Sequence, residues 1–141
     1  MTTKKSGSVR IAFLTDLHLG NNRIDPALMY HHLTEMVYPA LPGCDLLILG
    51  GDTFDSLVTL NSTASFYALQ MVSDLQVMAE QHSLIVRVMD GTFTHDRGQN
   101  MIFTVGSGGI RIGDTSALRV VNTLEAEHIR ALGITLVYIP D

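Results

Sequence analysis

Four short apolar runs constrain the fold of this 141-residue chain most strongly. They are rich in Ile, Leu and Val, do not alternate with polar residues, and span residues 10–15, 45–51, 83–89 and 134–140. Strands of this kind are buried on both faces, as in a parallel sheet. Helical segments separate the first three runs, and the order β-α-β-α-β predicts right-handed crossovers. The chain is therefore expected to form a layered α/β fold with a mostly parallel sheet.

Two segments between these runs carry helical signals. In residues 25–43, Asp25 can cap a helix and Pro26 suits its first position. The apolar face of this helix is predicted along Leu28, His32 and Met36. In residues 62–83, apolar residues recur at helical spacing, which predicts a second helix whose core face carries Phe66, Leu69, Val72, Leu75 and Met78.

The pattern is looser after Asp90. Residues 91–116 are polar and rich in glycine, which is typical of an active-site or mobile loop rather than packed structure. Residues 117–123 predict one more strand. Residues 124–133 fit either a short helix closed by Gly133 or part of a strand connection, and the sequence alone leaves both readings open.

Composition excludes several classes of protein. Apolar residues make up 46% and charged residues 16% of the chain, which argues against disorder, although residues 1–9 are expected to form a disordered tail. No apolar run approaches the ~20 residues of a membrane helix. One cysteine, Cys44, excludes an internal disulfide and fits a reducing cytoplasm, the expected location. The net charge of −5 gives no bulk attraction to nucleic acid, although bound metal ions could hold a phosphodiester.

Polar residues follow the first three predicted strands. Asp16 and His18 end the first and, on an extended chain, would share one face roughly 6.6 Å apart. Asp52 follows the second strand in "LGGDTFD", and His95 follows the third in "DGTFTHD". Ligands bind at the carboxyl ends of strands in open α/β sheets, so these side chains are expected to converge on one rim.

Carboxylates combined with imidazole suggest a transition-metal site. Such ligands suit Mn, Fe or Zn better than Ca or Mg alone. Two ions that share a carboxylate can clamp the attacking and leaving oxygens of a phosphoryl displacement, and Asp52 is the expected shared ligand. We therefore expect two divalent ions, foremost Mn²⁺, with Fe, Zn and Mg as alternatives.

These motifs together resemble the calcineurin-like metallophosphoesterase superfamily. The resemblance rests on D-x-H in "LTDLHLG", on G-D-x-x-D in "GGDTFD", and on the Gly…His-Asp segment, in this order and spacing. Within the superfamily, the motifs are most similar to those of the SbcD-type nuclease subunit of bacterial and phage DNA repair exonucleases. The resemblance implies that residues 1–141 are the N-terminal part of a metallophosphoesterase sandwich, an incomplete half of that fold.

The resemblance also implies a role for each motif residue. Asp16 and His18 would bind the first metal ion, and Asp52 would bridge both ions. His95 would contact the scissile phosphate or protonate the leaving oxygen. Asp55 would orient His95 through a carboxylate–imidazole hydrogen bond, although an aspartate here can also cap a helix.

Two features depart from the family pattern. Thr94 stands where the family has an asparagine ligand of the second metal, and a hydroxyl is a poorer neutral ligand than an amide oxygen. The family's later Gly-His-x-His segment is missing, and the only later histidine, His128, has neighbours typical of an exposed face. Asp96 is expected to be an exposed loop aspartate. The isolated chain is therefore expected to have an incomplete site.

The leading functional hypothesis is a metal-dependent phosphodiester hydrolase, a DNA exo- or endonuclease subunit that uses a two-metal hydroxide mechanism. The resemblance implies an SbcC-type ATPase partner and a homodimer of nuclease subunits. One alternative is a non-catalytic fragment with a binding or assembly role. Another is a phosphomonoesterase or protein phosphatase on the same scaffold, which would favour an arginine at the position of Ser56.

Overall fold

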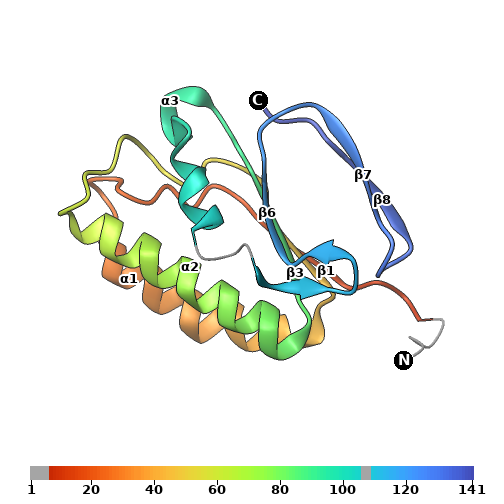
Figure 1. The fold of residues 1–141 in the computed structure, drawn as a ribbon. Helices are drawn as coiled ribbons and strands as arrows, with labels where there is room; N and C mark the ends of the chain where they lie inside the picture. The colour runs from red at the N-terminus through yellow and green to blue at the C-terminus, as the bar shows by residue number, and fades with distance from the viewer. Residues whose placement is uncertain (1–6, 106–108) are drawn as a thin grey trace.

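A four-stranded parallel sheet forms the centre of the protein (Figure 1). The computed structural model describes residues 7–105 and 109–141, so most of the predicted N-terminal tail lies outside the described residues. The strand order is β1-β2-β3-β6, and every neighbouring pair is parallel. These strands are β1 (Ile11–Leu14), β2 (Leu46–Leu49), β3 (Ile85–Met89) and β6 (Leu118–Val121). The predicted α/β fold with a parallel sheet is confirmed.

The fourth apolar run does not join this sheet. It forms β8 (Ile134–Tyr138), which pairs antiparallel with β7 (Glu125–Ile129) in a separate hairpin. Ile134 and Leu136 pack inward while Val137 is exposed, so β8 is buried on one face only. The fourth strand of the main sheet is instead β6, from the weaker pattern at 117–123, and residues 124–133 form β7 and a turn rather than a helix.

The strand β1 is an edge strand, and one of its faces lacks a cover. Ile11 and Phe13 are 48% and 63% exposed, which corrects the expectation of a strand buried on both faces. The central strands β2 and β3 do fit that expectation, with Leu46, Leu47 and Ile85 fully buried.

The helices α1 (Pro26–His32) and α2 (Thr63–His82) lie side by side on one face of the sheet (Figure 1). The side chain of Ser62 caps α2 by accepting a hydrogen bond from the backbone of Ser65. The predicted core face of α2 is only partly right, because Phe66 and Leu69 are 60% and 48% exposed. The face that packs on the sheet is a narrower stripe rich in alanine: Ala64, Ser65, Ala68, Met71, Val72, Leu75 and Ala79.

The first helical segment is divided into three pieces. Asp25 caps α1 as predicted, through a hydrogen bond from the backbone of Ala27. The chain continues as a π-helix, η1 (Leu33–Val37), and a 3₁₀ helix, η2 (Tyr38–Gly43), which contains two prolines. The predicted face is wrong, since Leu28 and Met36 are 50% and 73% exposed, and Leu33 and Leu41 are buried instead.

The β7–β8 hairpin covers the other face of β2 and β3 in a second apolar cluster that includes Leu46, Ile85 and Ile129. Arg87 of β3 is fully buried beneath it and holds Glu127 of β7 by two hydrogen bonds of 2.7 and 2.8 Å. The Tyr138 hydroxyl donates a third hydrogen bond to Glu127, at 2.6 Å. Although burial acts to raise it, these hydrogen bonds and the charges of Arg87 and Arg119 lower the pKa of Glu127 to about 2.

The segment expected to be a loop is largely ordered. Its described residues form α3 (Phe93–Asp96), η3 (Gln99–Thr104), and a small antiparallel pair, β4 (Arg111–Ile112) and β5 (Thr115–Ser116). Asn100 and Phe103 are fully buried, so this segment packs against the sheet despite its polar sequence. Among the described residues, no helix is both long enough and apolar enough to cross a membrane.

Candidate metal centre

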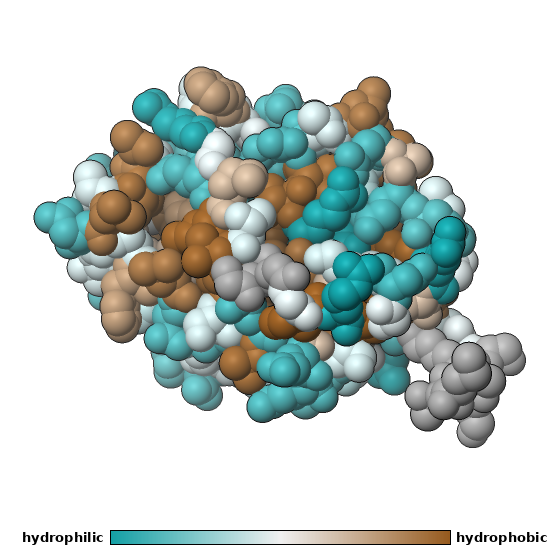
Figure 2. Space-filling view, viewed as in Figure 1, coloured by the Kyte–Doolittle hydropathy of each residue, from teal (hydrophilic) through white to brown (hydrophobic). Residues whose placement is uncertain are grey.

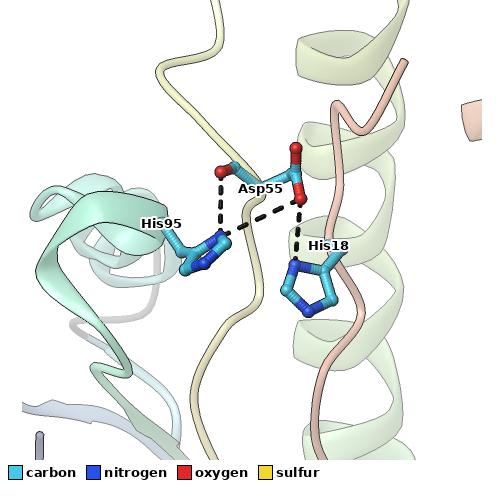
Figure 3. Close-up of side chains that lie close together, drawn as sticks. All are labelled: His18, Asp55 and His95. Atoms are coloured by element: carbon cyan, nitrogen blue, oxygen red, sulfur yellow. Dashed lines mark hydrogen bonds and ion pairs between the residues drawn. The ribbon is translucent and has the colours of Figure 1, made fainter. Parts of the chain in front are cut away.

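The carboxyl ends of β1, β2 and β3 bring together side chains from three distant segments. His18 follows β1, Asp55 follows β2, and His95 lies in α3 after β3. Figure 3 shows the two imidazole rings and the carboxylate pointing toward one another. The ring centroids of His18 and His95 are 5.0 Å apart, with planes inclined by 76°. Convergence follows from the parallel sheet, in which all strands end at the same edge.

Asp16, His18 and Asp52 form a second group that shares His18 with the first. The ligand atoms within each group of three lie within 4.8 Å of one another. The Nε2 atom of His18 lies 3.7 Å from a carboxylate oxygen of Asp16. The proximity of Asp16 and His18 is as expected, but its cause is different: β1 ends at Leu14, and neither residue is in an extended strand.

The backbone at this group is strained. Asp16, His18 and Asp52 have φ angles of 57°, 49° and 50°, in the left-handed region that residues other than glycine rarely adopt. Only two further non-glycine residues in the described chain share this conformation, Ser83 and Arg97. Backbone hydrogen bonds beyond the strand ends help to hold it, including one from the His18 amide to the Asp52 carbonyl at 3.0 Å. Strain of this kind concentrates at functional sites.

Asp96 provides the support for Asp52. Its carboxylate accepts backbone hydrogen bonds from Asp52, Phe54 and Gly91, at 3.1, 3.0 and 2.6 Å. Asp96 is only 1% exposed, so the expectation of an exposed loop aspartate is wrong. Its burial is tolerated because three amide donors surround the charge. Asp96 therefore fixes the backbone that carries Asp52.

Thr92 is the hydroxyl residue that contacts Asp52. Its amide donates to one carboxylate oxygen at 2.8 Å, and its hydroxyl lies 3.5 Å from the other. Thr94 is exposed, and its carbonyl accepts a hydrogen bond from the Arg97 side chain. The role of Thr94 as a ligand of a second ion stays a prediction.

Asp55 contacts both histidines in different ways. Its backbone carbonyl lies 2.9 Å from Nδ1 of His95, whereas its carboxylate is 3.9 Å from that atom. The expected carboxylate–imidazole hydrogen bond is thus replaced by a carbonyl contact. The carboxylate lies 3.1 Å from Nδ1 of His18 and accepts a hydrogen bond from Asn21 at 3.2 Å.

The Nδ1 atom of His18 is buried and forms no hydrogen bond within residues 7–105 and 109–141, although a carboxylate oxygen of Asp55 lies 3.1 Å away. A buried polar atom of this kind requires an explanation. Imidazole and carboxylate donors at these separations suit Mn²⁺, Fe²⁺ or Zn²⁺, and the residues present therefore fit a metal ion.

Sequence reasoning missed three supporting residues, namely Asn21, Thr92 and Gln99. Gln99 binds the backbone of Ser56 and Val58 and so ties the loop after Asp55 to the segment that carries His95. Asn21 lies just beyond the first motif, and that position was the only available signal for it. His128 is exposed as predicted, and its Nδ1 lies 3.0 Å from the hydroxyl of Thr135.

An apolar groove of about 260 Å³ lies along the loop after β2, and its wall includes Phe54, which precedes Asp55 in the sequence. Figure 2 shows apolar side chains gathered on the part of this face that carries η3 and the start of α2. Leu57 and Leu60 are 63% and 92% exposed beside this groove. Its wall consists of Phe54, Leu57, Val58, Leu60, Ser65, Gln99 and Ile102.

Three comparisons with known proteins give no family for this chain. No protein-family model, no curated protein and no solved structure matches it. The resemblance to calcineurin-like metallophosphoesterases therefore remains a prediction from the motifs.

Proposed function

We propose that this chain is a metal-dependent phosphodiesterase of the calcineurin-like metallophosphoesterase type, acting on DNA as an SbcD-type nuclease subunit. One observation carries the proposal: of the five non-glycine residues with left-handed backbone in the described part of the chain, three are Asp16, His18 and Asp52, which meet in one ligand group. A chain maintains such strain where side chains must be aimed at a common point. In this proposal the layered sheet is part of the metallophosphoesterase sandwich.

Each residue then has a defined task. Asp16, His18 and Asp52 hold divalent ions, with Mn²⁺ foremost, and Thr94 is the candidate for a further ligand. The ions supply charge stabilisation for a phosphoryl displacement and activate water at neutral pH. The residues of this chain position them: Asp96 and Thr92 fix Asp52, and Asn21 fixes Asp55.

In this proposal, His95 transfers a proton during the reaction. Because the carbonyl of Asp55 can only accept a hydrogen bond, the contact at 2.9 Å requires the proton of His95 to be on Nδ1. The orientation of the ring is then fixed, and Nε2 is left to serve the leaving oxygen. As a general acid, the ring would carry a second proton on Nε2, transfer that proton to the leaving oxygen, and be left neutral with its proton on Nδ1.

An extended diester substrate suits the surroundings of the centre. The Asp16 side chain is 61% exposed, so the centre is open at the surface rather than enclosed. The apolar groove that is lined by Phe54, the residue before Asp55, is the candidate place for a nucleobase of the substrate. The resemblance adds an SbcC-type ATPase partner, pairing of two nuclease subunits, and a cytoplasmic location to this proposal.

The test begins with calorimetric titration of the chain with Mn²⁺, followed by cleavage assays on single- and double-stranded DNA. We expect Asp52→Ala to lose metal binding and cleavage. His95→Ala should retain the metal and lose activity by about 10²- to 10⁴-fold. His128→Ala is the matched control, because His128 is exposed and its ring contacts Thr135.

Each other outcome changes the proposal in a defined way. A folded chain that binds no Mn²⁺, or an Asp52→Ala variant with full activity, overturns the metal centre. Metal binding without cleavage selects the non-catalytic binding role. Hydrolysis of p-nitrophenyl phosphate but not of bis(p-nitrophenyl) phosphate selects the phosphomonoesterase.

A further inference from the structure

His18 belongs to two different groups of metal-binding side chains. Within residues 7–105 and 109–141, two groups of three such side chains lie close enough to hold one ion, and both contain His18. The carboxylate-rich group consists of Asp16, His18 and Asp52, and the imidazole-rich group consists of His18, Asp55 and His95. The first offers one ring nitrogen and two carboxylate oxygens, whereas the second offers two ring nitrogens and one carboxylate oxygen. In the proposed function, only the carboxylate-rich group binds metal.

The donor atoms of the two groups favour different ions. Carboxylate oxygens suit Mn²⁺, whereas imidazole nitrogens suit Zn²⁺. Zinc that keeps an open coordination position is commonly held by three protein ligands, and two histidines with one carboxylate are one such set. The imidazole-rich group has this composition, so Zn²⁺ is the ion that its donors fit best.

The distances within the imidazole-rich group are close to those between ligands of one zinc ion. Ligands that lie about 2.0–2.1 Å from a tetrahedral ion are about 3.3 Å from one another. One carboxylate oxygen of Asp55 lies 3.1 Å from Nδ1 of His18 and 3.9 Å from Nδ1 of His95. The two rings and the carboxylate point toward one another (Figure 3). Small side-chain rotations are therefore sufficient to bring all three onto one ion.

The two groups compete for His18. Its Nε2 atom lies 3.7 Å from the Asp16 carboxylate, and its Nδ1 atom lies 3.1 Å from the Asp55 carboxylate. In a neutral imidazole one nitrogen carries the proton, and only the other can bind a metal. An ion in the carboxylate-rich group takes Nε2 and leaves the proton on Nδ1, beside Asp55. An ion in the imidazole-rich group takes Nδ1 and leaves the proton on Nε2, beside Asp16.

We propose that His18, Asp55 and His95 form an inhibitory zinc site. The inhibition rests on the proposed function, in which His18 holds Mn²⁺ and His95 is the general acid. Zinc takes His18 from Mn²⁺ and also binds Nδ1 of His95, the atom that otherwise donates to the Asp55 carbonyl at 2.9 Å. A His95 ring bound through Nδ1 keeps one proton, on Nε2, and its loss would leave an imidazolate instead of a neutral ring. One zinc ion thus removes a metal ligand and the proton donor together.

Zinc reaches this site from solvent. The side chains of His18, Asp55 and His95 are 26%, 29% and 33% exposed. The Nδ1 atom of His18 is itself buried, with the Asp55 oxygen 3.1 Å away. In the zinc complex the Asp55 carboxylate turns aside from this nitrogen and becomes a ligand of the ion. The buried nitrogen, which has no hydrogen bond in the described residues, thereby gains a partner.

Binding is measured on the full chain by calorimetric titration with ZnCl₂, alone and at increasing Mn²⁺ concentrations. We expect one tightly bound zinc ion per chain. Its apparent affinity should fall as Mn²⁺ rises, because both ions need His18. Nitrogen-15 NMR of the histidine rings, recorded with zinc alone, should show the ion on Nδ1 of His18 and of His95.

Two variants separate the two groups. His95→Ala should weaken zinc binding by at least about 100-fold, more than the loss of a residue that only supports a ligand. It should leave Mn²⁺ affinity within about twofold, because His95 lies outside the carboxylate-rich group. Asp16→Asn should weaken Mn²⁺ binding by at least about tenfold and change zinc affinity by less than about threefold, since the Asp16 side chain is 61% exposed. His128→Ala, the exposed control, should change neither affinity, and melting temperatures show whether each variant is folded.

Three results would overturn the inhibitory site. The first is a folded chain that binds no zinc. The second is equal zinc affinity of the wild-type chain and a folded His95→Ala variant. The third is hydrolysis with Mn²⁺ that zinc does not inhibit at concentrations that fill the site.

Failure of the proposed function has a different signature. A chain that neither binds Mn²⁺ nor hydrolyses a diester, but loses zinc in His95→Ala, overturns the proposed function while the zinc site itself is confirmed. Inhibition that is reversed by excess Mn²⁺ supports both proposals, because the two ions then exclude each other at His18.

Discussion

Replacing Asp96 by asparagine tests whether a buried carboxylate holds the strained backbone of the candidate metal centre. Asp96 accepts hydrogen bonds from three amides, those of Asp52 and Gly91 at one oxygen and that of Phe54 at the other. Asn has nearly the same shape but only one acceptor oxygen. If that oxygen keeps Asp52 and Gly91, the new amide group faces the N–H of Phe54, and two donors then oppose each other.

The expected loss follows from these contacts. A hydrogen bond to a charged group contributes about 1.5–3 kcal/mol and one to a neutral group about 0.5–1.5 kcal/mol, while an unpaired buried donor costs about 1–3 kcal/mol. Two weakened bonds and one lost bond amount to about 3 kcal/mol. Asp96→Ala, which leaves all three amides unpaired, should cost more. Many buried charges can be replaced by neutral groups without loss, but here every partner is a donor.

Urea unfolding followed by circular dichroism, without metal, measures the free energy of unfolding. The control is Asp114→Asn, because Asp114 is exposed and its carboxylate contacts exposed Arg130 and the hydroxyl of its neighbour Thr115, so its change should stay below about 0.5 kcal/mol. Mn²⁺ affinity of the folded Asp96→Asn chain should fall about tenfold, since Asp52 loses its support. A loss below 1 kcal/mol together with unchanged Mn²⁺ affinity would refute the reasoning.

Three further predictions concern the stability at low pH, the stability at high pH and two glycines. Glu127 has a pKa of about 2 in the fold against an ordinary value of 4.5, so its ionised form stabilises the protein by about 3 kcal/mol above pH 4.5. That contribution should disappear as the pH falls toward 2, and a Glu127→Gln variant should lack this part of the pH dependence in urea unfolding. Stability should also fall above about pH 10, because burial raises the pKa of Tyr38 and only the unfolded chain ionises freely. Gly91→Ala should lower the free energy of unfolding by at least about 2 kcal/mol, because a Cβ there would lie 2.2 Å from the Asp52 nitrogen. Gly98→Ala meets no atom within 4 Å, so it should cost only about 1–2 kcal/mol for its positive φ. Equal losses of stability for the two variants in thermal melts would contradict this difference.

The sequence predicts the first three strands because their apolar runs are short, rich in Ile, Leu and Val, and separated by clear helix signals. Asp25 and Ser62 begin their helices as local rules require. Once the strands are parallel, their polar ends must meet, and so the proximity of His18, Asp55 and His95 was predictable. These predictions depend on local patterns and on one rule of sheet geometry.

Predictions that depend on how elements pack against one another are less accurate. The predicted face of α2 follows steps of three residues from Phe66, and such steps drift around a helix of 3.6 residues per turn. The observed face is centred on Ala68 and Leu75, and the alanines of this face let the helix approach the sheet closely. The run at 134–140 is as apolar as a central strand, yet it forms a hairpin because Glu127 and Tyr138 attach it to the buried Arg87.

The burial of Asp96 could not be read from its neighbours, because a polar residue in a glycine-rich segment is ordinarily exposed. Two of its three amide partners are 42 and 44 residues distant in the sequence, at the end of another strand. The same contacts explain how Asp52 keeps a φ of 50° without glycine's freedom, because its amide and those of Phe54 and Gly91 are all bound to the single buried carboxylate of Asp96. Local pattern thus identifies the candidate ligand residues, while the residues that hold them in a strained geometry are identified only by the fold. For this reason Asp96, and not a member of the predicted ligand set, gives the most direct test of how the centre is built.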